Sequence, residues 1–286
     1  MKKIVSALVC VGVVLTTSPT FADNGKQYRA VMDKAVNSLV TVKAVLKTAM
    51  KFGGQGRDTE SRLEVQGLLV TTDGLVMFSN LPLNPDKMMG DSNGGGDDGD
   101  RRFGMKITPT NFKVTFGREE KEYPAFLVAT DSKLDLAFVK IEDLAGRKVA
   151  PISFDASASA LIGQEVLSVT RLSKGYDYAP YFSTLHIAGE IRKPRKAWML
   201  DMGMAEPAMP IYTLEGKIIG VVAMVEGSVR EEDSGGGFSM FSRGGGGMQS
   251  FVVPSAVVQG VLDQAKIRSV SVTQKRKQEK HPAPKK

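Results

Sequence analysis

Short apolar runs, many of them alternating with polar residues at every second position, recur along most of the chain. A period of two is typical of a half-buried β-strand, and a short unbroken apolar run between turn signals is typical of a fully buried one. Many short strands separated by turns indicate a barrel or a sandwich. The runs occupy residues 38–46, 63–72, 74–79, 112–116, 136–141, 165–172, 216–225 and 250–254.

Two helices are expected beside these strands. One covers about residues 25–37, and the other begins near Pro254 and Ser255 and continues through VVQGVLDQAKI. A serine at this place is a plausible N-terminal cap, because its side chain can bond a free backbone group of the first turn. The expected fold class is therefore all-β with a C-terminal helix.

Three segments break the strand pattern. Residues 84–104 are acidic and rich in glycine, residues 227–249 are rich in glycine and serine, and residues 269–286 are charged and contain two prolines near their end. None of them can bury enough apolar surface to offset the entropy lost on ordering. We expect two mobile loops at 84–104 and 227–249, and a basic disordered tail at 269–286.

The N-terminus has the pattern of an export signal. Lys2 and Lys3 precede an apolar run that ends in Thr20-Phe21-Ala22, a charged start, an apolar middle and small residues before a cleavage point. We expect residues 1–22 to be a signal peptide and the protein to be periplasmic or secreted, with a retained anchor as the alternative. Cys10 is the only cysteine, so removal of this segment would leave no disulfide and no thiol chemistry.

Charge argues against a nucleic-acid groove. The net charge is +7, but Lys2, Lys3 and the tail at 275–286 account for all of it, since that tail holds six basic residues and one glutamate. A neutral body with a basic end differs from the basic face that nucleic-acid binding requires. The tail is expected to be solvated, with weak contact to an anionic envelope surface as the alternative.

Several stretches, in order, resemble the protease domain of HtrA-type (Deg-like) serine proteases. GLLVTTDGLVMFSN is similar to the segment that carries that family's catalytic histidine. The stretch EKEYPAFLVATDSKLDLAFVKI is similar to its R-x-Y-x-A…D-x-x-x-D-L-A-x-L-K-I element. PIYTLEGKIIGVVA and FVVPSAVVQGVLDQ are similar to the strands and helix after its nucleophile. The resemblance covers about residues 36–265 and implies a chymotrypsin-like double β-barrel over residues 23–268, without the PDZ domain common in the family.

The resemblance also assigns the three catalytic positions. The carboxylate falls on Asp135, the base on Leu81 and the nucleophile on Pro207, within AEPAMP at 205–210. Leucine cannot accept a proton, and proline supplies neither a hydroxyl nor the backbone N–H that an oxyanion hole uses. The resemblance therefore implies a degenerate triad and a protein that is not an enzyme.

A different serine stands in a string that looks catalytic. Ser234 lies in EEDSGGGF, similar to the D-S-G-G around a trypsin-like nucleophile, but it follows the strand that the family places after its nucleophile. The histidines are His186, in an expected strand of the second barrel, and His281, in the tail. A triad is recognised by geometry rather than by a local string, so Ser234 is expected to be a decoy and His186 a structural or surface residue.

Other chemistry is weakly indicated. Asp91, Asp97, Asp98 and Asp100 lack the register of a calcium loop, and no cluster of histidine and cysteine suggests zinc. We expect no cofactor and no metal. Methionines at 199, 202, 204 and 209 surround the nucleophile position, either as core filling or as an adaptable apolar groove, and Trp198 is expected to pack in the barrel.

Three functions remain open from the sequence. The first is an inactive protease homologue of the cell envelope that binds protein or peptide clients, or that modulates or scaffolds proteolysis by an active relative. The second is an active serine endopeptidase with a displaced constellation built on Asp135 and an unexpected serine. The third is a structural envelope protein that uses its basic tail. Fold alone does not decide among them.

Overall fold

The computed structural model describes most of the chain. The expectations for the signal peptide, for Ser234 and His281, for the acidic aspartates and for nearly all of the loops at 84–104 and 227–249 concern residues outside this part. The described residues are 24–52, 55–84, 104–154, 157–193, 195–201, 205–225 and 249–280.

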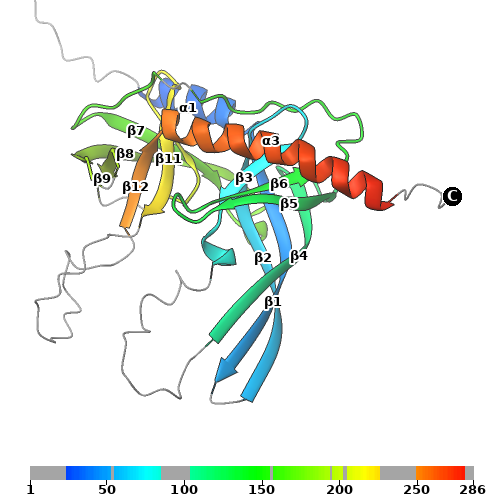
Figure 1. Ribbon diagram of the computed structural model, residues 1–286. Coiled ribbons are helices and arrows are strands. Elements are labelled where there is room, and N and C mark those ends of the chain that lie inside the picture. Colours follow the sequence, from blue (N-terminus) through cyan, green and yellow to red (C-terminus); the bar gives the residue numbers. More distant parts are fainter. Residues whose placement is uncertain are drawn as a thin grey trace, which may run out of the picture.

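Twelve described strands form two closed barrels of six strands each, so the expected double β-barrel is confirmed (Figure 1). The first barrel has the order β1-β2-β3-β6-β5-β4 and the second has the equivalent order β10-β11-β12-β9-β8-β7. The strands of the first barrel are β1 (Leu39–Phe52), β2 (Gln55–Leu69), β3 (Leu75–Ser79), β4 (Gly104–Phe116), β5 (Tyr123–Asp131) and β6 (Leu136–Ile141). Those of the second are β7 (Glu165–Arg171), β8 (Pro180–Ile191), β9 (Ala197–Leu200), β10 (Pro210–Tyr212), β11 (Ile218–Val225) and β12 (Gln249–Pro254).

Three apolar clusters hold this architecture together. One fills the first barrel around Val40, Phe78 and Val139, and a second fills the other barrel around Trp198 and Ile219. The third lies between the barrels and under the helices. The expectation that Trp198 packs inside the barrel is confirmed. Continuous apolar runs form β3 and β6 because both faces of these strands are buried.

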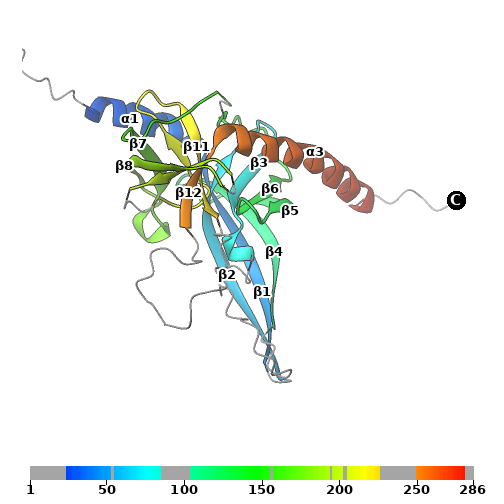
Figure 2. The same cartoon turned by 60° about the vertical axis from the view of Figure 1, so that its left-hand side comes forward.

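Strands β1, β2 and β4 continue beyond the first barrel as a three-stranded arm (Figures 1 and 2). Strand β1 pairs with β2 without interruption from Leu39↔Leu68 to Phe52↔Gln55. The pairing of β2 with β3 begins only at Gly67, which marks where the arm leaves the barrel. Residues 55–62 are polar, so the sequence pattern missed this half of β2.

Helices cover the junction of the barrels. Helix α1 (Asn24–Ala35) was expected at 25–37, and its Tyr28 hydroxyl donates to Glu165 of β7 at 2.5 Å. Helix α3 (Ser255–Lys280) begins where expected, and the Ser255 hydroxyl donates to the Ile218 carbonyl of β11 at 2.8 Å. No described helix has the length and apolarity needed to cross a membrane.

The expectation of a disordered tail from residue 269 is wrong for residues 269–280, which continue α3. Ser269 is buried, and Arg268 donates to the Val128 carbonyl at 3.0 Å. Arg276 pairs with Glu142 at 2.7 Å and lies over the ring of Phe126. Contacts with β5 and with the residue after β6 in the first barrel therefore stabilise a helix whose composition alone predicted a solvated end.

Candidate functional site

Asp135 lies in the tight connection between β5 and β6 and is almost fully buried. Its φ is +57°, a left-handed conformation that side chains other than glycine rarely adopt. The Ser79 hydroxyl donates to its Oδ2 at 2.7 Å, and the Asn80 N–H donates to its carbonyl at 2.9 Å. A described partner of this carboxylate is thus a hydroxyl at the end of β3, whereas the carboxylate of a catalytic triad pairs with an imidazole.

Leu81 begins the short 3-10 helix η1 (Leu81–Leu83) directly after β3. Its N–H donates to the Ser79 hydroxyl oxygen at 3.2 Å, and its carbonyl accepts from Asn84 at 3.1 Å. Pro82 follows within the first turn, where its missing N–H costs nothing. The backbone beside Asp135 is therefore fixed, but the side chain of Leu81 cannot exchange a proton.

The loop before β10 is closed as a β-turn. The Met209 N–H donates to the Glu206 carbonyl at 3.2 Å, with Pro207 and Ala208 as the central residues. Proline is favoured at the first central position, and the φ of +65° at Ala208 is what a type II turn requires at the second. The Ala208 N–H donates to the Val222 carbonyl at 2.7 Å. Pro207 has no N–H and that of Ala208 is occupied, so neither residue offers a donor to a developing oxyanion.

Glu206 connects this turn to the first barrel. Its Oε2 accepts from the Thr170 hydroxyl of β7 at 2.6 Å, and its carboxylate also accepts from the backbone N–H of Gln66 in β2. Burial raises the pKa of Glu206, although these two hydrogen bonds partly oppose the shift. A partly buried carboxyl therefore occupies the loop beside Pro207.

The strand register brings the two halves of the site together. In the β2–β3 pair, Gly67 lies opposite Phe78, so continuing the register by one residue sets Gln66 opposite Ser79. Glu206 bonds to Gln66 and Asp135 bonds to Ser79, which places the Pro207 turn beside the end of β3 that carries Leu81. The three positions that the sequence singled out thus gather at one junction between the barrels.

Ser79 is the hydroxyl that the structure places on Asp135, so it is the natural candidate for a displaced nucleophile. It is 7% exposed, and its oxygen both donates to Asp135 and accepts from the Leu81 N–H. An attacking serine needs a reachable oxygen and a base whose pKa suits proton transfer near neutral pH. The bonding of Ser79 is that of a structural residue, which fixes the turn between β3 and η1.

His186 lies in β8, as expected, and takes no part in this junction. Its Nδ1 lies 2.9 Å from Oδ2 of Asp201, and both side chains are largely exposed. Asp201 also accepts from the His186 N–H at 3.0 Å. The pKa of Asp201 is lowered by this backbone hydrogen bond first and by the imidazole second. The expectation of a surface histidine is confirmed.

A family model described as a trypsin-like peptidase domain matches residues 63–236. The chain belongs to this family. The matched residues run from β2 past β11, and they include Leu81, Asp135, Pro207 and Ser234. A comparison with curated proteins found no match. The trypsin-like family accounts for the chymotrypsin-like arrangement of two barrels with the site at their junction.

Two residues of this trypsin-like site were missed from the sequence. Ser79 was expected only as the last residue of the strand at 74–79, and Glu206 only as a neighbour of the nucleophile position at Pro207. The signal for Glu206 was an acidic residue directly before the Pro-Ala pair of a turn that leads into an apolar strand. Its burial depends on β2 and β7, which lie far away in sequence.

The remaining candidates have simpler outcomes. Met209 is buried in the cluster between the barrels, whereas Met199 is 41% exposed, so these two methionines do not share one groove. Among the described residues no group of histidine, cysteine and acidic side chains could hold a metal ion. Residues 202 and 204 lie outside the described part of the chain.

Proposed function

We propose that this protein is a catalytically inactive, HtrA-like member of the trypsin-like family that acts by binding other proteins. The supporting observations are the hydrogen bond from Ser79 to Asp135 and the closed turn at Pro207. They agree with the resemblance, which assigns the base to Leu81 and the nucleophile to Pro207. Loss of triad members lowers the rate of hydrolysis by several orders of magnitude. Catalysis is then replaced by recognition on the same scaffold.

The partners that we propose are unfolded or extended protein segments, or an active protease relative in the cell envelope. Support comes from the surface of the second barrel, where Tyr181 is 39% exposed and close enough to Glu206 for that carboxylate to raise its pKa, after burial. An exposed aromatic beside the inactive junction provides an amphipathic contact surface for a chain that approaches along the barrel interface. The location in the envelope rests on the N-terminal sequence pattern.

An active endopeptidase with a displaced constellation is the competing proposal. It would need a reachable serine and a base within hydrogen-bond distance of it. Ser234 lies outside the described residues, and among those described the imidazole of His186 is paired with Asp201 at the surface of the second barrel. Within the described part of the chain, the competing proposal therefore has the carboxylate of Asp135 but no reachable serine paired with a base.

Incubation of the purified full chain with reduced, unfolded casein separates the two. We expect no cleavage fragments over a day at equimolar protein, together with slower light scattering from a denatured client. Ser234→Ala should behave as the unmodified chain in both assays. Cleavage that disappears in Ser234→Ala would refute the inactive assignment. Unchanged client aggregation at a tenfold excess of protein would refute client binding while leaving inactivity standing.

A further inference from the structure

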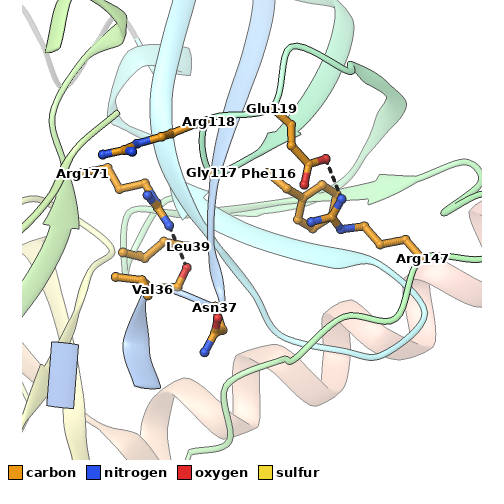
Figure 3. Close-up of a pocket in the computed structure, with 9 residues that line it drawn as sticks. All are labelled: Val36, Asn37, Leu39, Phe116, Gly117, Arg118, Glu119, Arg147 and Arg171. Atoms are coloured by element: carbon orange, nitrogen blue, oxygen red, sulfur yellow. Dashed lines mark hydrogen bonds and ion pairs between the residues drawn. The ribbon is translucent and has the colours of Figure 1, made fainter. Parts of the chain in front are cut away.

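A cavity of about 330 Å³ lies between residues of the first barrel and the end of β7 in the second (Figure 3). The end of β7, the turn after β4 and the segment between α1 and β1 meet here. Three arginines from three different segments reach it, and Glu119 is the acidic residue among those that line it. The lining residues are Val36, Asn37, Leu39, Phe116, Gly117, Arg118, Glu119, Arg147 and Arg171.

Arg171, at the end of β7, is held in place by backbone oxygens. Its Nη1 donates to the Tyr178 carbonyl and its Nη2 to the Val36 carbonyl, both at 3.1 Å. Its Nε is buried without a hydrogen-bond partner, and within the described part of the chain no carboxylate pairs with the side chain. The two hydrogen bonds to carbonyls fix the orientation of the Arg171 side chain. A guanidinium has five N–H donors, so others remain available to a ligand, and its positive charge is not neutralised by a described carboxylate.

The other two arginines differ in how well they are neutralised. Arg147 pairs with Glu119 at 2.6 Å and stacks over the ring of Phe116. Arg118 pairs with Asp177 at 3.1 Å, but both side chains are more than half exposed, so water and salt weaken that pair. Figure 3 shows Arg118 beside Arg171, with the pair of Arg147 and Glu119 across the cavity. The wall formed by Arg118 and Arg171 therefore carries more positive than negative charge.

Burial, and then the neighbouring charge of Arg118, lower the pKa of Arg171. Both effects mean that the cationic form of Arg171 is under-stabilised in the structure as it stands. A negative group placed between the two guanidinium groups would reverse the second effect and offset the first. The geometry provides room for it, since Gly117 has no side chain and a Cβ there would come within 3.7 Å of Nη2 of Arg171.

We propose that this cavity binds a small oxyanion of two or more negative charges, as a phosphate group or as a di- or tricarboxylate. Planar guanidinium groups bind phosphate and carboxylate oxygens in the same bidentate way, which is the shared chemistry of the two. The volume is at the lower end of the range for small-molecule pockets and exceeds what a single chloride needs. Arg118 and Arg171 would contact the anion, and Arg147 would add a longer-range attraction.

This site would connect the two barrels. Arg118 belongs to the turn after β4 in the first barrel, and Arg171 ends β7 in the second. The neighbouring residue, Thr170, donates to Glu206 beside Pro207. An anion held by Arg171 therefore acts on the end of β7, next to the Thr170 side chain that bonds Glu206, so binding in the cavity can alter the inactive junction.

Isothermal titration calorimetry of the full chain tests the proposal at constant ionic strength, with inorganic phosphate and citrate as probes and glycerol as the neutral control. We expect a Kd below about 1 mM for at least one anion, set by two charged contacts. Arg118→Gln should weaken that binding at least about tenfold, and Arg171→Gln by at least as much. Arg192→Gln, at an 89% exposed side chain of the second barrel, removes the same charge and should leave the Kd unchanged.

The two arginine variants and the two anions test different parts of the proposal. Arg171 also holds two backbone carbonyls, so the exposed Arg118 gives a test that does not depend on how Arg171→Gln folds. Binding of phosphate but not citrate identifies a phosphate-bearing ligand, and the reverse identifies a carboxylate one. No heat with either anion, or equal weakening by Arg192→Gln, would overturn the proposal.

Discussion

The two barrels share one strand order but differ at their rims, by which we mean the strand ends and turns that meet at the junction between the barrels. In the first, the rim keeps a buried carboxylate, Asp135, whose described partner is the Ser79 hydroxyl. In the second, the rim at the same junction has a closed turn at Pro207 and a partly buried carboxyl at Glu206. Both barrels keep a filled interior. The interior packing determines the fold, whereas the rim residues can change their chemistry while the walls remain.

Substitutions in the barrel walls should therefore lower the free energy of unfolding more than substitutions at the rims. Gly220 in β11 faces the backbone of β12, and a Cβ there would overlap the Val253 carbonyl. We expect Gly220→Ala to lower the free energy of unfolding by about 3 kcal/mol or more, because the two strands must separate. Gly260→Ala on an exposed position of α3, where a Cβ meets nothing within 4 Å, should raise it by up to about 1 kcal/mol. Urea denaturation measures both, and equal effects would contradict the expectation that the barrel wall has no space for added side-chain volume.

A substitution at the rim of the first barrel should lower the stability of the fold without changing any catalytic activity. Ser79→Ala removes the hydroxyl donor of the buried Asp135 and the acceptor of the Leu81 N–H. We expect a loss of about 1–3 kcal/mol in the free energy of unfolding. Ser271→Ala, whose exposed hydroxyl donates to Ile267 within α3, should change it by less than about 0.5 kcal/mol. A Ser79→Ala variant of unchanged stability would show that this hydrogen bond is not part of the fold's support.

At the rim of the second barrel, Glu206 should make the stability of the fold depend on pH. Burial raises the pKa of Glu206 above its ordinary 4.5, so above pH 4.5 the folded chain binds more protons at this group than the unfolded chain. Its contribution to stability therefore falls as pH rises from 4.5 through the folded pKa, and then levels off. Glu206→Gln should remove this decline in urea unfolding measured from pH 5 to 8.

Glu215→Gln is the matched control for Glu206. Hydrogen bonding, first to the Thr213 side chain, lowers the pKa of this carboxyl, so its contribution to stability is lost only as pH falls below 4.5. The slope between pH 5 and 8 should be unchanged. A Glu206→Gln variant with the slope of the unmodified chain would show that this carboxyl is not protonated by burial.

The smallest effect is expected where α3 rests on the first barrel. Arg276→Ala removes an ion pair with Glu142 and a contact with the Phe126 ring, both partly exposed. A loss of about 1 kcal/mol is expected, with faster amide exchange in residues 269–280. Lys277→Ala, at an exposed neighbouring position, should leave exchange unchanged. Equal exchange in the two variants would argue against docking of this part of the helix by Arg276.

Sequence reasoning reached the barrel walls and missed much of what lies beyond them. Alternation located β1, β6 and β7 because one or both faces of these strands are buried. It missed residues 55–62 of β2, since these polar residues become a strand through backbone pairing with β1. It missed helix 269–280, which depends on contacts with Val128 and Glu142 that lie far away in sequence.

The same limit applies to the sites. Asp135 could be located because it sits in a recognisable stretch, and its burial agrees with that. Its pairing with Ser79 depends on the left-handed turn at Asp135 and on the register of β3 and β6, which no local pattern encodes. The three cavity arginines are 29 and 24 residues apart along the chain, so only the closed barrels bring them together.

Inactivity is the central proposal, and a fluorophosphonate probe tests it most directly. The probe forms a covalent adduct with an activated serine, and intact-mass spectrometry counts the adducts. We expect the full chain to remain unlabelled under conditions that fully label an active trypsin-like protease. A single stoichiometric adduct, at Ser79, Ser234 or any other serine, would show an assembled nucleophile and contradict the account.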